Sequence, residues 1–414
     1  MIKNNLYSAA ITIALCVMVS CNQANQQQQN NPPQEMEEPT YEQGSFGYDV
    51  QFLKEKDSGL VILRSEQSQV LVSPKYQAKV FTSSASGDQG TSFGWINYEA
   101  FSGEPDPHMN AYGGENRFWL GPEGSKYSLF FPAGSEMIYD NWKTPAPIDT
   151  QSWEISNQTA RSVSMTKDMS LVNYANTNFN MRAEREVSIL NRSQIEDMLG
   201  VTLDQVEAVG FSTDNALINT GNTAWTKETG APSIWILDMF VPSDETVIFI
   251  PYEASAEGPV VTSDYFGEIP EERLKFENGK LFFHADGKSR GKLGLSPQRS
   301  KPIAGSYDAK NRILTVTTFD LDKEATYLNQ EWTPDKDPYL GDAINAYNDG
   351  PLEDGNQMGP FYELESVSPA AFLEPGEKIT HQHNVFHFHG SEAQLDKLAQ
   401  QTLGVSLEEI KQAF

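Results

Sequence analysis

The chain has almost no cysteine and few basic residues. Its only two cysteines, Cys16 and Cys21, lie near its start, so the rest of its 414 residues can form neither a disulfide nor a cysteine-based metal site. Lysine and arginine number 30 against 57 aspartates and glutamates, which gives a formal net charge of −27. A surface of this sign repels phosphate backbones and anionic lipid headgroups. We therefore expect no nucleic-acid partner and no binding of the folded part to a membrane surface.

Several common catalytic motifs are also missing from the sequence. It contains no G-x-S-x-G elbow, no phosphate-binding P-loop, no G-x-G-x-x-G, no H-E-x-x-H and no complete EF-hand loop. The apolar stretch from Ala9 to Val19 is too short to span a bilayer. Serine hydrolase, nucleotide-dependent and zincin chemistry are therefore disfavoured.

The first twenty residues have the features of a secretory signal peptide. Lys3 precedes the apolar stretch, which ends at Ser20 just before Cys21. The Met18-Val19-Ser20-Cys21 sequence resembles the lipobox of bacterial lipoproteins, which implies that Cys21 is lipidated. The alternative is an ordinary signal peptide cut nearby, with Cys21 left free. The lipobox resemblance predicts a protein anchored in the cell envelope by lipid alone, on its periplasmic or outer-surface face.

The remaining chain divides into three parts by composition. Residues 21–44 are rich in glutamine and asparagine and poor in apolar residues, so we expect a disordered tether. Residues 45–390 contain many short alternating or apolar runs between Gly, Pro, Asn and Asp clusters, which is typical of an all-β, mainly antiparallel sandwich or barrel. Residues 391–414 are predicted to form a C-terminal helical segment.

Helix-capping patterns interrupt the strand pattern in two places. Ser193-Gln-Ile-Glu196 is a capping box and predicts a short helix within 194–208. Ser391 and the Ser406-Leu-Glu-Glu409 box predict the C-terminal helices in the same way. The two places share sequence, since LGVTLDQV from Leu199 is similar to LGVSLEEI from Leu403.

The segment from Tyr112 to Trp119 is the first with candidate functional residues. In an extended strand Glu115, Arg117 and Trp119 share one face, and Asn116 lies on the other. An arginine beside a tryptophan suits a sugar, because the indole covers the apolar ring face and the guanidinium donates to oxygens. The alternative is a structural pair of Arg117 with Glu115 over a half-buried Trp119.

The second segment runs from Met358 to Ser366. It places Glu363 and Glu365 on one strand face, about 6–7 Å apart, so repulsion raises the pKa of one of them and makes it a candidate base. A solvated edge strand would show the same spacing. Upstream, the loop with Asn348 and Asp349 suits hydroxyl recognition or a Ca²⁺ site, although turn formation alone also explains it.

The third segment, from Thr380 to Gly390, contains four of the six histidines. His381, His383, His387 and His389 share one strand face, with phenylalanines opposite. His381 and His383 are spaced to bind a divalent metal such as Zn²⁺ together with a carboxylate. A metal-free sugar or proton-transfer role and a purely structural row are the other two interpretations.

The end of the chain resembles that of the aldose 1-epimerases (galactose mutarotases). The resemblance is carried by Tyr362-Glu-Leu-Glu-Ser366, then Leu373-Glu-Pro-Gly-Glu-Lys378 and the histidine strand, and by Gly113-Gly-Glu-Asn-Arg-Phe-Trp119. With its N-terminus the chain is most similar to uncharacterised bacterial lipoproteins of galactose mutarotase-like fold. The resemblance implies a large two-sheet β-supersandwich with a sugar on a concave face.

The same resemblance implies site residues. It places the catalytic base on Glu365, with Glu363 second, and substrate binding on Arg117. Epimerases have an acid histidine in a central strand, and the comparable segment from Asn219 to Trp225 has none. His108 or His383 would then supply the proton. The remaining substrate-binding candidates are Trp119, Asn116, Trp225, Asn348 and Asp349.

Two hypotheses of function follow. The first is an envelope enzyme that acts on carbohydrate by acid–base chemistry, as an epimerase or a uronide lyase, and needs no cofactor. The second is a non-catalytic glycan-binding lipoprotein that uses the same face. A bound Zn²⁺ or Ca²⁺ ion is a further expectation, ranked below a metal-free pocket.

Overall fold

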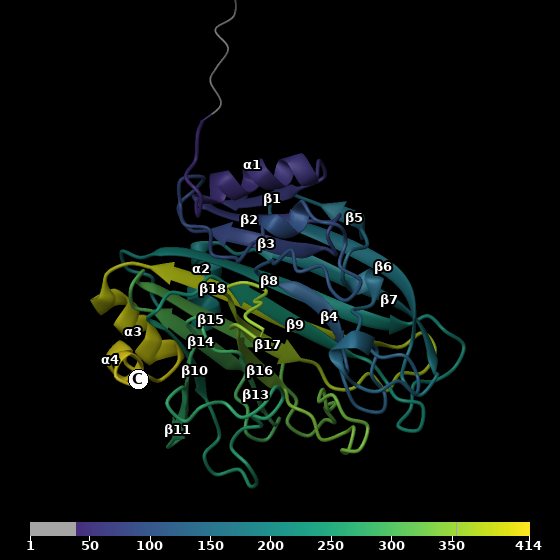
Figure 1. Cartoon of the computed structure of the whole chain (residues 1–414). Coiled ribbons are helices and arrows are strands. Elements are labelled where there is room, and N and C mark those ends of the chain that lie inside the picture. Colours follow the sequence, from purple (N-terminus) through teal and green to yellow (C-terminus); the bar gives the residue numbers. More distant parts are fainter. Residues whose placement is uncertain (1–38, 353) are drawn as a thin grey trace, which may run out of the picture. The chain divides into compact units, whose positions relative to one another are not determined.

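Three antiparallel sheets form most of the structure. The computed structural model describes residues 39–352 and 354–414, of which Tyr41–Phe414 form one compact unit. A ten-stranded sheet has the order β11 (Leu274–Glu277), β12 (Lys280–His284), β10 (Thr246–Pro251), β14 (Ile303–Asp308), β15 (Ile313–Phe319), β18 (Lys378–His389), β8 (Glu207–Asn219), β7 (Asn178–Ile189), β6 (Ser162–Val172), β5 (Glu154–Gln158). A five-stranded sheet has the order β13 (Gly291–Leu295), β16 (Ile344–Asn348), β17 (Tyr362–Val367), β9 (Ser233–Phe240), β4 (Arg117–Gly121). A small sheet contains β1 (Val61–Ser65), β2 (Ser68–Ser73) and β3 (Lys79–Ser84) (Figure 1).

The two larger sheets pack together because apolar and polar side chains alternate along their strands. In β7, apolar residues such as Phe179 and Met181 are buried in the main core, and polar residues between them are exposed. Leu364 of β17 and Val385 of β18 are fully buried in that same core. The all-β, mainly antiparallel sandwich predicted from the sequence is therefore confirmed.

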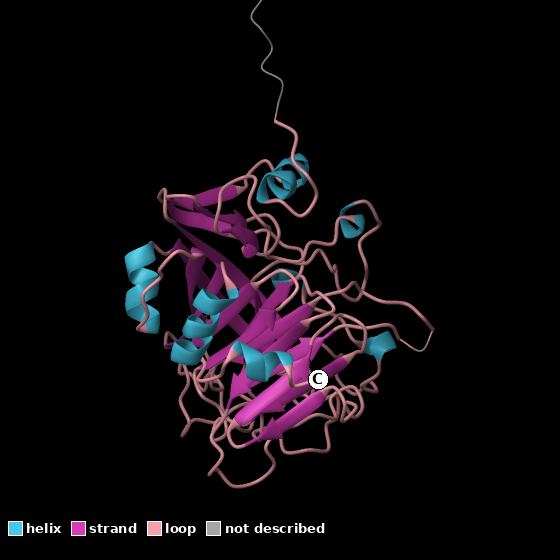
Figure 2. Ribbon diagram, turned by 90° about the vertical axis from the view of Figure 1, so that its left-hand side faces the viewer, coloured by secondary structure: helices cyan, strands magenta, loops and turns pink. Residues whose placement is uncertain are grey.

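Helices cover the opposite face of the ten-stranded sheet around β18. Phe386 and Phe388 of β18 pack with Leu395, Leu398 and Ile410 of the C-terminal helices. Figure 2 shows helices at the margins of the stacked sheets. The helices are α1 (Phe46–Lys56), α2 (Arg192–Leu199), α3 (Glu392–Thr402) and α4 (Leu407–Lys411), with short 3₁₀ turns η1 (Glu99–Phe101), η2 (Tyr139–Asn141) and η3 (Ala146–Ile148).

Most helix predictions are confirmed, with two corrections. Helices α3 and α4 begin after Ser391 and Ser406 as expected. Helix α2 begins after Asn191 rather than Ser193, because the Asn191 side chain accepts a hydrogen bond from the Gln194 amide, and it ends at Gly200. Helix α1 was not predicted; it packs apolar side chains against the small sheet.

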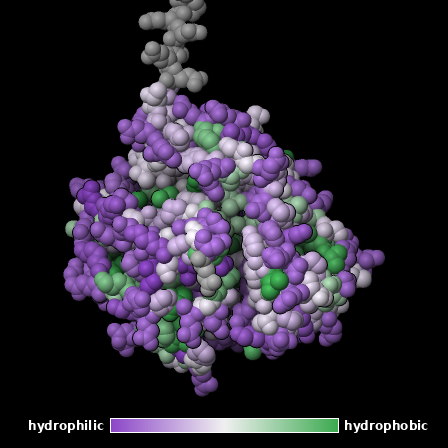
Figure 3. All heavy atoms as spheres, in the orientation of Figure 1, coloured by the Kyte–Doolittle hydropathy of each residue, from purple (hydrophilic) through white to green (hydrophobic). Residues whose placement is uncertain are grey.

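The N-terminal expectations lie largely outside the described residues. These are the signal peptide over 1–20, the lipidated Cys21 and the tether of 21–44 up to residue 38. The compact unit already begins at Tyr41, whose hydroxyl donates to Asp88 at 3.3 Å. No helix among the described residues is long and apolar enough to cross a membrane. The face drawn in Figure 3 is mostly hydrophilic, in keeping with the charge of the chain.

Candidate functional site

The five-stranded sheet forms the floor of a cleft of about 780 Å³. Alternate residues of its strands face the cleft, and the residues between them face the ten-stranded sheet. Arg117 and Trp119 of β4 and Glu363 of β17 therefore reach the cleft together. The other floor residues are Trp235, Leu237, Met239, Lys292 and Tyr347.

Aromatic side chains line the cleft. The rings of Trp119 and Trp235 meet edge to face with centroids 5.5 Å apart. Trp142 and Trp332 stack at 5.9 Å, and both come from loops above the floor. Flat aromatic surfaces of this kind suit the apolar face of a sugar ring.

Two buried ion pairs lie between these aromatic rings. The Arg117 guanidinium donates to Glu363 Oε1, and the Lys292 ammonium donates to Glu365 Oε2 at 3.1 Å. The Trp235 indole N–H also donates to Glu365 Oε2, at 2.8 Å. Trp119 and Trp235 each have a cation over the ring face. The guanidinium carbon of Arg117 is 5.1 Å from the Trp119 centroid, and Lys292 Nζ is 4.5 Å from the Trp235 centroid. The floor thus combines aromatic rings with buried charged groups that are held by hydrogen bonds.

Burial raises the pKa of three cleft carboxyls, Glu123, Asp349 and Glu363. Burial raises the pKa of Glu363; Arg117 opposes the rise and Glu365 adds to it. Burial also raises the pKa of Glu123, against the attraction of the Lys292 ammonium. Glu123 forms no ion pair within the part of the chain that the structure describes, whereas Glu363 is paired with Arg117. Arg117 thus favours the ionised form of Glu363, and burial favours the neutral form of Glu123.

Glu123 is held in place by a close backbone contact. Its amide donates to the Gln330 side chain at 2.8 Å, and the Ser125 amide donates to the Glu331 carbonyl at 2.8 Å. A Cβ on Gly124 would lie 1.9 Å from that carbonyl oxygen, so only glycine allows the two segments to approach. The same contact positions Trp332, which follows Glu331.

The structure brings together some predicted site residues. Arg117, Trp119, Glu363 and Asp349 line one cleft, and Glu365 lies just beneath its floor. The partner of Arg117 is Glu363 and not Glu115, because the regular strand begins only at Arg117. Glu115 turns inward instead and accepts from His387 at 3.1 Å.

Other predicted binding residues have structural contacts instead. Asn116 is fully buried between the sheets, where it donates to Asp238 at 2.6 Å. Trp225 packs in the core edge to face with Phe179 at 5.5 Å. Asn348 is fully buried and bonds the 287–289 turn. None of these three lines the cleft, which corrects the sequence prediction for them.

His108 and His383 do not reach the cleft either. His108 donates through Nδ1 to the Trp142 carbonyl at 2.6 Å and stacks on Tyr139 at 4.6 Å. His383 is fully buried on the other side of the floor. Neither ring lines the described cleft, so the structure gives no support to proton transfer from either of them to a sugar there.

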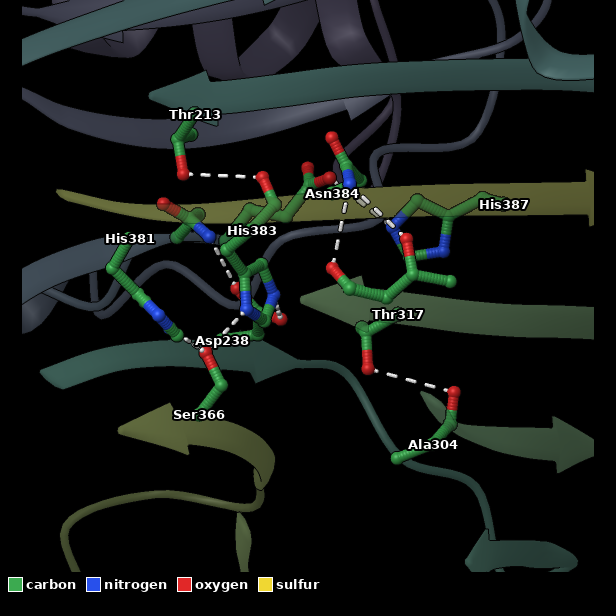
Figure 4. A network of polar contacts seen from close by, with 12 residues as sticks. Thr213, Asp238, Ala304, Thr317, Ser366, His381, His383, Asn384 and His387 are labelled. Atoms are coloured by element: carbon green, nitrogen blue, oxygen red, sulfur yellow. Dashed lines mark hydrogen bonds and ion pairs between the residues drawn. The ribbon is translucent and has the colours of Figure 1, made fainter. Parts of the chain in front are cut away.

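His381 and His383 instead belong to a buried hydrogen-bonded chain between the sheets (Figure 4). Ser366 Oγ lies 2.7 Å from His381 Nε2 and 2.8 Å from His383 Nδ1. His383 Nε2 lies 2.7 Å from Asp238 Oδ2. Since a carboxylate accepts, His383 donates through Nε2, Ser366 donates to its Nδ1, and His381 donates to Ser366.

This arrangement does not fit the predicted metal site. The facing ring nitrogens of His381 and His383 are both bonded to Ser366, and both rings are buried with no open position for water or substrate. Among residues 39–352 and 354–414, no group of three or more metal-ligating side chains could hold an ion, whether at the histidines or at the acidic loop. The structural interpretation of the histidine row explains His381, His383 and His387.

The neutral state of His381 predicts acid sensitivity. Burial, and secondarily His383, lowers the pKa of His381 to about 3. The unfolded chain takes up this proton near pH 6.5 but the folded chain does not, so stability falls as the pH drops through this window. Between pH 7 and pH 5 we expect the free energy of unfolding, measured with urea, to fall by roughly 2 kcal/mol more in wild type than in His381→Gln.

A control lies on the same strand. His389 is partly exposed at the end of the row, beside Glu207 at 3.3 Å. His389→Gln should keep the pH dependence of wild type. Parallel pH curves for wild type and His381→Gln would contradict a neutral, buried His381.

Several cleft residues were missed from the sequence. Glu123 follows the strand of Arg117 directly, in Gly121-Pro-Glu-Gly124. Its position next to that strand was the only feature of the sequence that could have indicated a place in the site. Lys292, Arg290, Trp235 and Trp332 come from distant strands and loops without a shared motif.

The comparisons with known proteins identify the family. A model of a family of unknown function, DUF6786, matches residues 44–414. The chain belongs to this family. A search of curated proteins found no significant match.

Solved structures match over most of the DUF6786 chain. A galactose mutarotase-like protein from Lactobacillus casei is 11% identical, with a TM-score of 0.47 and coverage of 80% of this chain and 100% of that one. A galactose mutarotase related enzyme from Lactobacillus acidophilus is 9% identical (TM-score 0.45; coverage 80% and 97%). The Slr1438 protein from Synechocystis is 13% identical (TM-score 0.49; coverage 80% and 96%). At these identities the likeness concerns the fold alone.

Proposed function

We propose that this DUF6786 protein binds a carbohydrate in the cleft and acts on it by acid–base chemistry. The observation that carries the proposal is the combination of tryptophan surfaces with buried charged groups in one cavity. The cavity of about 780 Å³ is within the usual size range for a small-molecule ligand. Trp119, Trp142 and Trp332 supply stacking surfaces, and the charged floor supplies hydrogen bonds to hydroxyls.

Glu363 and Glu123 are the proposed base and acid. Arg117 favours the ionised form of Glu363, and burial favours the protonated form of Glu123, which forms no ion pair among the described residues. Epimerisation at the anomeric carbon requires no more than such a pair. Glu365, bonded to Lys292 and Trp235, then orients the floor rather than touching the sugar.

Non-catalytic glycan binding is the second candidate. It is favoured by the enclosure of the histidines, since no histidine lines the described cleft to act as the acid of an epimerase. Aromatic stacking and floor hydrogen bonds would serve this function equally well.

The removal of one aromatic wall tests carbohydrate binding. Trp332 lines the cleft and is half-buried, so Trp332→Ala should leave the fold intact. A panel of neutral and acidic glycans is first screened with wild type to find the glycan that binds best. We expect the affinity of Trp332→Ala for that glycan, measured by calorimetry, to be about tenfold lower. Phe276→Ala is the control, because this exposed aromatic lies outside the cleft. Unchanged affinity in Trp332→Ala would contradict the assigned wall.

We further propose that Cys21 carries the lipid anchor and holds the protein in the cell envelope. The proposal rests on the lipobox resemblance and on the absence of any other cysteine that could pair with a mature Cys21. Mass spectrometry of the mature N-terminus should show an acylated Cys21. An unacylated terminus would contradict it.

A further inference from the structure

Arg290 is a cleft residue with unused hydrogen-bonding capacity. It is exposed, and its guanidinium carbon lies 3.9 Å from the centroid of the Phe266 ring. Nε donates to the Tyr347 hydroxyl at 3.3 Å. It forms no ion pair with any acidic residue that the structure describes, and neither terminal nitrogen has a protein partner among those residues.

The surrounding residues hold Arg290 in place. The Asn348 side chain accepts from the Gly287 amide at 2.8 Å and donates to the Ser289 carbonyl at 2.9 Å, which fixes the turn before Arg290. Tyr347 donates to Asp349 at 2.8 Å, so its hydroxyl lone pairs remain available to Arg290. The guanidinium is thus oriented by a ring face and a hydroxyl, neither of which neutralises it.

The other cleft cations are different. Arg117 is paired with Glu363, and Lys292 with Glu365. Arg290 forms no ion pair with any described residue, although its charge acts on the Glu123 carboxyl, whose pKa it lowers. The carboxylic residues Glu104, Asp106, Glu123 and Asp349 also line the cleft, and none of them forms an ion pair with a described residue. The two free terminal nitrogens of Arg290 are therefore the lining groups that suit a ligand carrying a negative charge.

We propose that the ligand is an acidic sugar whose carboxylate binds the two terminal nitrogens of Arg290. This inference rests on the proposed function and names its substrate class. The planar fork matches a carboxylate in a bidentate manner. Phe266 meets Trp332 edge to face at 6.1 Å, and Trp332 stacks on Trp142, so the Arg290 site adjoins the proposed sugar wall. A uronic acid residue presents a ring and a carboxylate in this way.

Matched acidic and neutral probes test this inference. Oligogalacturonate and oligoglucuronate are compared with their carboxyl-reduced, neutral forms by calorimetry on the folded chain. We expect wild type to bind the best acidic probe about 10- to 100-fold more tightly than its reduced form. Arg290→Gln should remove this preference, and Arg290→Lys should restore part of it because charge returns without the fork.

Lys288→Gln is the matched control. Lys288 lies two residues away, is exposed and pairs with Asp244 at 2.6 Å outside the cleft, so the preference should persist. Equal binding of acidic and reduced probes, or an unchanged preference in Arg290→Gln, would overturn the inference and leave carbohydrate binding intact. Failure of wild type to bind any glycan, neutral or acidic, would overturn the proposed function as well.

Discussion

Replacing Asp238 with alanine is expected to lower the free energy of unfolding by about 3–5 kcal/mol. Asp238 is fully buried between the two large sheets. One carboxylate oxygen accepts from His383 at 2.7 Å and the other from Asn116 at 2.6 Å. Alanine would leave both donors without a partner in the protein interior, where each lost hydrogen bond is costly.

Asp238 also compensates a buried charge. Arg185 is almost completely buried and donates to Asn116 and to Asn215, the latter at 2.8 Å. Burial lowers the pKa of Arg185 to about 9, and the Asp238 carboxylate opposes this lowering. Removal of Asp238 would therefore leave a positive charge in the interior without its nearest counter-charge.

Urea unfolding at pH 7 measures this effect. Asp238→Asn keeps the side-chain volume but loses the charge and one acceptor, so we expect an intermediate loss, which is informative if the alanine variant does not fold. Asp168→Ala is the matched control, because Asp168 pairs with Arg182 at 2.7 Å on the exposed surface. Its substitution should have little effect. Equal losses in Asp238→Ala and Asp168→Ala would contradict a stabilising role for the buried chain.

Replacing Glu363 with glutamine is expected to lower turnover of a sugar substrate by about 10²–10⁴-fold. The amide retains the shape and an acceptor for Arg117 but cannot take a proton. Affinity for the sugar should change much less than the rate, since the aromatic walls remain. Steady-state kinetics and calorimetry on the same preparation separate the two effects, and thermal melting checks the fold.

Glu123→Gln should lower the turnover by a comparable factor, because it removes the proposed acid. Because the base must be ionised and the acid protonated, the wild-type rate should follow a bell-shaped pH profile whose two limbs are set by the raised pKa values of Glu363 and Glu123. Glu277→Gln, in the edge strand β11, is an exposed control outside the cleft. Full activity in both cleft variants would refute the pair. Sugar binding without turnover in wild type would establish the non-catalytic alternative.

The sequence predicted which side chains share a face of a strand. Alternation placed Glu363 and Glu365 on one side of β17, and it separated the β18 histidines from Phe386 and Phe388. These predictions succeeded because the two-residue repeat of a strand depends only on its own backbone. The capping boxes of α3 and α4 were equally local.

Similar local sequences nevertheless formed different structures. After Gly404, the residues from Leu407 form helix α4, whereas after Gly200 the similar residues from Leu203 extend towards β8. Both leucines are buried in the same apolar cluster. The structure that follows each is therefore decided by its neighbours, the adjacent helix α3 in one case and the central sheet in the other.

The amino-acid sequence by itself determined the sheet class, the strand faces, the C-terminal helices and the inclusion of Arg117, Trp119 and Glu363 among the site residues. Only the tertiary structure decided the partners, which are Glu363 for Arg117 and Asp238 for His383. It also left Arg290 without an ion pair among the described residues. Local repeats fix the direction of a side chain. Its partner depends on which distant strand lies opposite and on where the connecting loops return, and these are set by the packing of the whole core.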